Sequence, residues 1–155
     1  MPRLLLFAAC EKVQYDSVDH SASLIGVFQG YTVTTSKRPI EKTPSDAVVL
    51  QANTDSALPI RWAVFALWKK INGEDDGKQF QQVCEFVRPN GKVQPLETLP
   101  FKMDSSYHRL TLTVHGFPVS DEGDCIVRLY LKTDALEPVF IRDYPISVTH
   151  QEADD

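Results

Sequence analysis

Apolar and polar residues alternate in two stretches of the C-terminal half of the chain. In residues 108–115, HRLTLTVH, Leu or Val occupies every second position, and in residues 125–132, CIVRLYLK, Cys, Val or Leu does. Successive side chains of a β-strand point to opposite faces, so this period predicts strands with one buried and one solvated face. Antiparallel sheets with one solvated face are typical of such patterns.

Two other stretches are apolar on both faces. Residues 4–9, LLLFAA, form a short uninterrupted run that ends at Cys10 and is followed by Glu11 and Lys12. An export signal needs an apolar region of roughly 7–15 residues, so a buried first strand is favoured and a truncated lipoprotein signal is the alternative. Residues 61–68, RWAVFALW, predict a strand that lies at the centre of the molecule or presents one aromatic face to something else.

Turn residues separate the remaining predicted strands. Residues 86–93 predict a hairpin in which Pro89 begins a type I turn and Gly91 takes a left-handed conformation. Residues 73–78 are expected to form a second hairpin, and residues 119–124 a turn around Gly123. Residues 24–33 predict a single strand, and residues 139–148 a final strand in which a proline, Pro145, requires an edge or a bulge.

About eight short strands without an amphipathic helix predict an all-β fold, an antiparallel two-sheet β-sandwich that is immunoglobulin-like or similar. Residues 1–150 are expected to form one domain, with a long loop insertion at about 34–59. The apolar island at 47–50 inside that insertion predicts a short edge strand or one helical turn. Residues 151–155 are expected to be a disordered tail.

Net charge and cysteine content limit the expected partners and the expected compartment of the protein. The 155 residues carry a formal net charge of −5, which argues against a nucleic-acid partner, and no run approaches the length of a membrane span. The odd set of Cys10, Cys84 and Cys125 predicts reduced, buried thiols in a cytoplasmic protein. An immunoglobulin-type disulfide between Cys84 and Cys125 is not expected, because both tryptophans precede Cys84.

No motif predicts catalysis, a cofactor or a metal. The chain lacks a Gly-x-Ser-x-Gly turn, HExxH or paired CxxC spacing and a phosphate-binding glycine loop. A cysteine–histidine pair is disfavoured because the alternation places Cys125 inward and His108 and His115 on the opposite register. The acidic clusters at 74–76 and 121–124 lack the ligand spacing of a calcium loop and are expected to be solvated turns.

Surface recognition is therefore the predicted activity. Edge strands and aromatic side chains are common docking features, and the candidate interface residues are Trp62, Trp68, Tyr130 and Arg128. The alternative for the two tryptophans is an ordinary place in the core. The first hypothesis is a non-enzymatic binding or adaptor module for a protein partner or a second copy of itself. The second is a small-ligand or carbohydrate-binding sandwich, which a concave pocket lined by Trp or Tyr would favour.

A resemblance to known proteins is carried by the apolar first strand and by three segments: 24–28 (LIGVF), 88–91 (RPNG) and 122–131 (EGDCIVRLYL). In these segments the chain resembles a bacterial family of small stand-alone proteins of unknown function. Cys125 stands where such closing strands often carry Tyr, and the insertion at 34–59 is a second departure. The resemblance implies a small bacterial sandwich protein, and it transfers no site residues.

Overall fold

The computed structural model describes residues 1–36, 50–51, 57–134 and 136–152. Within these ranges the chain is almost entirely strand, with a single 3₁₀ turn, η1 (Gly73–Asp75). The strands are β1 (Arg3–Tyr15), β2 (Ala22–Val27), β3 (Gly30–Ser36), β4 (Leu50–Gln51), β5 (Ala57–Lys69), β6 (Gln79–Val87), β7 (Val93–Lys102), β8 (Tyr107–Pro118), β9 (Gly123–Thr133) and β10 (Val139–Glu152). Among these residues no helix is long and apolar enough to cross a membrane.

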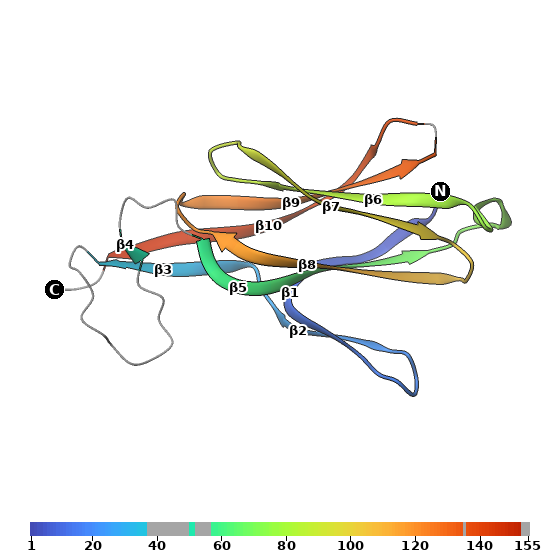
Figure 1. Ribbon diagram of the computed structural model, residues 1–155, viewed down its shortest axis with the longest axis horizontal. Coiled ribbons are helices and arrows are strands. Elements are labelled where there is room, and N and C mark those ends of the chain that lie inside the picture. Colours follow the sequence, from blue (N-terminus) through green and yellow to red (C-terminus); the bar gives the residue numbers. More distant parts are fainter. Residues whose placement is uncertain (37–49, 52–56, 135, 153–155) are drawn as a thin grey trace.

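The strands form two sheets that pack face to face (Figure 1). The first sheet has four strands in the order β2-β1-β5-β8, and the second has six in the order β4-β3-β10-β9-β6-β7. The predicted all-β, two-sheet architecture is confirmed, with more strands than the eight expected. The buried first strand is confirmed as part of β1, where residues 7–10 are buried, although Leu5 and Leu6 remain partly exposed.

Aromatic side chains fill the space between the sheets. The Trp62 ring lies 5.5 Å from Phe117 and 6.1 Å from Phe86, both measured between centroids. Trp68 stacks on Phe101 at 5.8 Å, and its indole Nε1–H donates to the side-chain oxygen of the buried Gln82 at 2.9 Å. The indole N–H of Trp68 and the side-chain oxygen of Gln82 thus satisfy each other inside the core.

The second sheet is not purely antiparallel, which corrects the prediction. β3 runs parallel to β10, and β4 runs parallel to β3. The predicted strand at 24–33 is in fact two strands, because the chain leaves the first sheet at Phe28 and enters the second at Gly30. Phe28 lies in this crossover and packs into the core, where its ring centroid is 5.8 Å from that of Trp62. β3 therefore pairs with β10 on the side opposite β9, and it runs in the same direction as β10.

One predicted hairpin and one predicted turn are crossovers between the sheets. Residues 73–78 connect β5 to β6, and residues 119–124 connect β8 to β9, although the members of each pair lie in different sheets. The prediction of a hairpin at 73–78 is wrong for this reason. Gly123 does take a positive φ of 127° in its turn. The β6–β7 hairpin is confirmed, with Gly91 at φ 85° and its N–H donating to the Arg88 carbonyl at 2.8 Å.

Pro145 lies where β10 has a neighbour on one side only. It pairs with Ile126 of β9, while the pairing of β10 with β3 begins two residues later, at Ser147. The missing N–H of proline therefore breaks no ladder, and the predicted edge position is confirmed. Gln151 and Glu152 belong to β10, so the predicted tail is wrong for them, and residues 153–155 lie outside the described residues.

The insertion is described at its two ends and at one strand within it. Its first residues extend β3 to Ser36, and its last belong to β5, which begins at Ala57. The short β4 pairs with β3 at Leu50 and Gln51, which agrees with the predicted edge strand at the end of the apolar island. The rest of the insertion, residues 37–49 and 52–56, lies outside the described residues.

All three cysteines are free and buried, as predicted. Burial raises the pKa of Cys84 to about 12, and burial also raises the pKa of Cys125 to about 11. The pKa of Cys10 is raised for the same reason. The thiolate is the reactive form of cysteine, so these thiols are chemically quiet near neutral pH.

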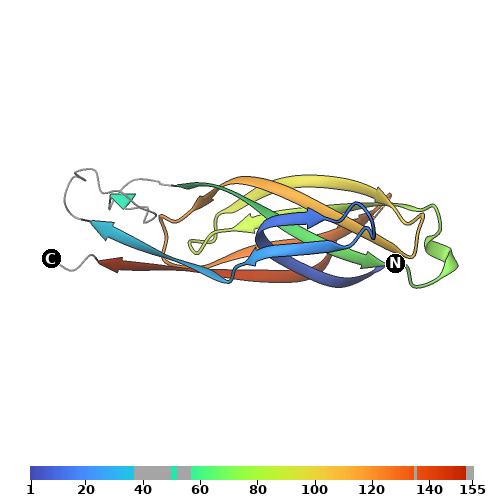
Figure 2. The same ribbon diagram turned by 90° about the horizontal axis from the view of Figure 1, so that it is seen from below.

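β1 pairs with two different strands along its length. Its first half, from Arg3 to Cys10, pairs with β5, and its second half, from Cys10 to Tyr15, pairs with β2. Figure 2 shows that the second half turns back, so that the β1–β2 hairpin, residues 10–27, lies across the outer face of β5 and β8. Beneath it Phe65 is 2% exposed. This hairpin explains why β5 is apolar on both faces.

Gly26 permits the close approach of the two hairpin strands. It has φ 64°, and a Cβ at this position would meet the Glu11 side chain at 2.6 Å. We expect Gly26→Ala to lower the free energy of unfolding by about 1–2 kcal/mol, because a left-handed alanine is strained and its Cβ would also crowd the Glu11 side chain. Gly77→Ala is the matched control, since Gly77 has φ 67° in open space.

Urea titration measures both variants. The Gly26 variant should be the less stable of the two, and adding Glu11→Ala should remove the difference between them, because Glu11 supplies the crowding. Equal stabilities of the two single variants would contradict the close packing of this hairpin.

Candidate binding cleft beside strand β8

The outer face of the first sheet carries a row of β8 side chains opposite β5. Tyr107 pairs with Lys69, Arg109 with Leu67, and Thr111 with Phe65. Because alternate residues of a strand share a face, Tyr107, Arg109 and Thr111 all point away from the sandwich core. The β1–β2 hairpin covers this face near Phe65 and leaves its Tyr107 end open.

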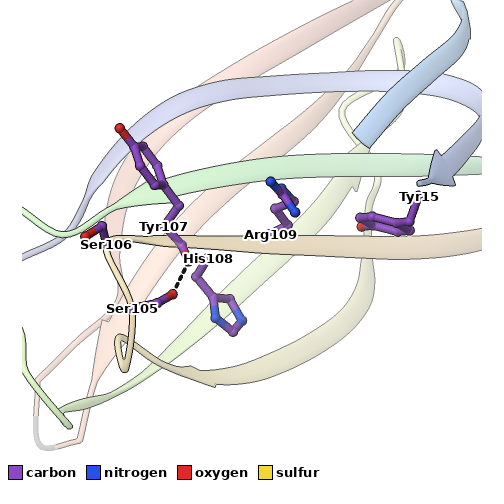
Figure 3. A pocket seen from close by; sticks show the side chains of 6 residues that line it. All are labelled: Tyr15, Ser105, Ser106, Tyr107, His108 and Arg109. Atoms are coloured by element: carbon purple, nitrogen blue, oxygen red, sulfur yellow. Dashed lines mark hydrogen bonds between the residues drawn. The ribbon is translucent and has the colours of Figure 1, made fainter. Parts of the chain in front are cut away.

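A cleft of about 560 Å³ lies at that open end. It is lined by Tyr15 from the hairpin and by residues at the start of β8: Ser105, Ser106, Tyr107, His108 and Arg109 (Figure 3). Figure 3 shows Arg109 between the two tyrosines along β8. Binding clefts for small molecules and peptides commonly have volumes of 300–1,000 Å³.

Two hydrogen bonds attach the hairpin to β8 and fix the cleft. The Tyr15 hydroxyl bonds the Thr111 hydroxyl at 2.5 Å, and the Arg109 guanidinium donates to the backbone carbonyl of His20. The hairpin loop is itself ordered by Asp16, whose carboxylate accepts the N–H of Val18 at 2.7 Å. Backbone N–H groups that donate to Asp16 lower the pKa of its carboxyl. These bonds hold Tyr15 in place, with about half of the side chain exposed.

Arg109 brings a positive charge into the cleft, in a chain whose net charge is −5. Carboxylates are also near, because Asp16 and Asp19 lie in the adjoining hairpin loop and Asp104 directly precedes Ser105. Among the described residues, no carboxylate lies within ion-pair distance of Arg109. Lys69 adds a second positive charge, with its ammonium 5.9 Å from the centre of the Tyr107 ring. The arrangement offers guanidinium N–H donors, two exposed phenol rings and the Ser106 hydroxyl to a ligand. The Ser105 hydroxyl already donates to the backbone carbonyl of Tyr107 at 2.6 Å.

His108 departs from its predicted register. It lies on the core side of β8, where its ring stacks on Phe101 at 5.1 Å between centroids. Its partner in the β5 ladder is the inward-pointing Trp68, so the strand alternation itself turns it inward. Burial lowers the pKa of His108. The prediction that His108 and His115 share the outer register is therefore wrong for His108.

The four predicted interface residues divide into two pairs. Trp62 is 1% exposed and Trp68 is fully buried, so neither reaches the surface of this fold. Both indole N–H groups are bonded inside, that of Trp62 to the Gly116 carbonyl at 2.9 Å. The structure corrects the interface prediction for these two and supports the alternative of an ordinary place in the core. The two tryptophans lie on the face of β5 that points into the core, and the face that was free to meet another segment is covered by the β1–β2 hairpin.

Tyr130 and Arg128 do lie on a surface, the outer face of the second sheet. Tyr130 packs edge-on against Phe140 at 6.1 Å between centroids. Arg128 forms a two-point ion pair with Asp143, at 2.9 and 3.2 Å, and this pairing raises its pKa. Arg128 is thus already bound to a carboxylate of its own chain, whereas Arg109 has no such partner among the residues that the structure describes.

The acidic loops hold the crossovers in place. Asp121 forms an ion pair with Arg88 at 3.3 Å. The Glu122 carboxylate accepts a hydrogen bond from the backbone N–H of His150 at 3.0 Å, and the Asp124 carboxylate accepts one from the Ser147 hydroxyl at 2.6 Å. In the 74–76 cluster, Asp75 is buried instead of solvated, which corrects the prediction of a solvated turn there. Within the described ranges no group of three or more His, Cys, Asp or Glu side chains could hold a metal ion.

The sequence did not single out Tyr15 or Tyr107, and it placed Arg109 merely on a solvated face. The available signal was the doubly apolar β5, which required some segment to cover its second face. In comparisons with known proteins, no protein-family model and no curated protein matches this chain.

Proposed function

We propose that this protein is a non-enzymatic binding module that holds an acidic, extended segment of a partner protein in the cleft between Tyr15 and Tyr107. The observation that carries the proposal is Arg109, which lies between two exposed tyrosines and has no carboxylate within ion-pair distance in the described part of the chain. Arginine binds carboxylates through two parallel N–H donors, and tyrosine and arginine dominate binding hot spots. Lys69 extends the positive charge beyond the cleft.

A peptide fits the site because the cleft lies beside the start of the edge strand β8 and the tyrosines that flank it are exposed. An extended chain can lie along this face with an acidic side chain on Arg109 and apolar side chains against the phenol rings. Such a partner is recognised by complementary charge, which also speeds its encounter with the site.

A carbohydrate or a small carboxylated ligand is the second candidate. The feature that favours it is the concave site itself, which has two tyrosines for stacking and the Ser106 hydroxyl for hydrogen bonds. Its ligand would occupy the same residues, so one set of variants distinguishes ligand classes at one site.

A binding role also accords with the rest of the chain. The three thiols are buried with raised pKa values, which disfavours a cysteine nucleophile. We extend the proposal to a cytoplasmic protein of bacterial, immunoglobulin-like sandwich type, on the strength of its free cysteines and of the segments at 24–28, 88–91 and 122–131.

Fluorescence anisotropy with a labelled peptide of alternating Glu and Leu tests the proposal, with a Lys–Leu peptide as the charge control. We expect Arg109→Ala to weaken binding of the acidic peptide about 10- to 100-fold, which is the range for one charge-assisted hydrogen-bonded contact. Arg142→Ala is the matched control, since Arg142 is an exposed arginine of β10 in the other sheet.

Unchanged binding in the Arg109 variant, or equal binding of the two peptides, would contradict the peptide proposal. A panel of neutral oligosaccharides and short dicarboxylates is titrated in parallel. Binding of one of these alone, lost in Tyr107→Ala, would establish the second candidate instead.

A further inference from the structure

β8 ends the first sheet and presents an open edge. The Lys70 N–H donates to the Ser106 carbonyl, and Tyr107 pairs with Lys69 in the same ladder. In an antiparallel ladder this phase makes 107, 109, 111 and 113 the residues whose N–H and C=O point away from β5. In the described part of the chain no strand lies on that side of β8.

This edge lacks the protection that the edges at β2 and β7 carry. β7 contains two prolines, Pro95 and Pro100, and its register with β6 is broken by a bulge. β2 is six residues long and includes the left-handed Gly26. β8 has no proline before Pro118, and its register with β5 is unbroken from Arg61 to Lys69. Long regular edges of this kind are templates for strand pairing.

We infer that β8 pairs antiparallel with β8 of a second copy of this chain, about a two-fold axis at Thr111. In this register Thr111 faces its own equivalent and Arg109 faces Thr113 of the second copy. These residues carry the outward N–H and C=O groups, so each pair exchanges both backbone hydrogen bonds. The two four-stranded sheets become one continuous sheet, with an isologous contact as two-fold symmetry requires.

Charge and apolar side chains favour this register over the one with its axis at Leu112. A shift of the axis to Leu112 would bring Arg109 opposite His115 of the second copy, whereas the axis at Thr111 places no two basic residues in direct opposition. On the core side, Leu110 comes opposite Leu112 of the second copy. Leu110 and Val114 are half-buried at the rim of the core, and the second β8 completes their cover.

The inference is independent of the proposed ligand. Arg109 and Tyr107 contribute backbone to the edge, while their side chains remain on the outer face with the cleft. A dimer places two such clefts on the same face of the joined sheet. A bivalent partner would then bind more tightly than a single segment does.

Sedimentation equilibrium over a wide concentration range tests the dimer. We expect a mass that rises from 17.5 kDa for one chain to twice that value. Thr113→Pro should weaken dimerisation at least 10-fold, since it removes an N–H that points outward and leaves the β5 ladder intact. Thr113→Val keeps the N–H and the shape of the side chain, and it should dimerise as the parent chain does.

Amide hydrogen exchange supplies a residue-level readout that a folding defect would not imitate. The amides of Arg109, Thr111 and Thr113 should gain at least 10-fold protection on going from the monomer to the dimer. A mass that stays at 17.5 kDa at every concentration would overturn the inference. So would a dimer that persists unchanged in folded Thr113→Pro, because it would use another surface.

Discussion

Replacing Trp62 with alanine should lower the free energy of unfolding by about 3–5 kcal/mol, the usual cost of truncating a buried tryptophan. The indole packs against Phe28, Phe86 and Phe117, which come from both sheets and from the crossover between them. Its removal leaves a cavity among three rings, and it also leaves the Gly116 carbonyl without its indole donor. Urea unfolding followed by circular dichroism measures the loss.

Tyr130→Ala is the matched control, because Tyr130 is also aromatic and was predicted together with Trp62 as a candidate interface residue. Tyr130 lies on the outer face of the second sheet, where its ring contacts Phe140. Its truncation should cost about 1 kcal/mol, within the range for one aromatic pair. Similar losses for the two variants would contradict the placement of Trp62 in the core.

Alkaline pH should destabilise the fold through its buried thiols. The pKa of Cys84 rises from an ordinary value near 9 to about 12 in the folded state. A raised folded pKa means that the folded state holds the proton more tightly, so the full contribution is present below pH 9 and is lost as the pH rises toward 12. Between pH 8 and 10.5 this one thiol should cost about 2 kcal/mol.

Cys84→Val isolates that contribution, because valine has a similar volume and does not titrate. Urea titrations at pH 8 and pH 10.5 should show a smaller loss of stability for the variant, by about 2 kcal/mol. Cys125, whose pKa is raised to about 11, keeps its own contribution in both proteins. Equal losses for the parent and the variant would show that Cys84 is not the buried thiol that the fold requires.

The strands themselves could be predicted from the sequence, but their partners could not. Two-residue periodicity reveals which segments alternate between core and solvent, and it located β8 and β9 closely. A hairpin and a crossover between sheets use the same turn residues, so residues 73–78 and 119–124 gave no sign of which they were. The parallel approach of β3 to β10 depends on the crossover at Phe28, where one glycine-containing apolar run hides two strands.

The cleft escaped prediction for a related reason. Tyr15 and Arg109 are 94 positions apart, and only the fold-back of the β1–β2 hairpin brings them together. The apolar run predicts a first strand only as far as Cys10, where β1 changes its partner from β5 to β2, and the polar residues after it gave no sign that β1 continues to Tyr15. The two tryptophans were assigned to a candidate surface because the residues that cover β5 could not be identified from β5 itself.

A heteronuclear NMR titration with the Glu–Leu peptide tests the proposed binding site most directly. The account predicts that the largest backbone amide shifts occur at Tyr15 and at residues 105–109, with small shifts at Arg128 and Tyr130 on the other sheet. Largest shifts at Arg128 and Tyr130, or no shifts anywhere at millimolar peptide, would contradict it.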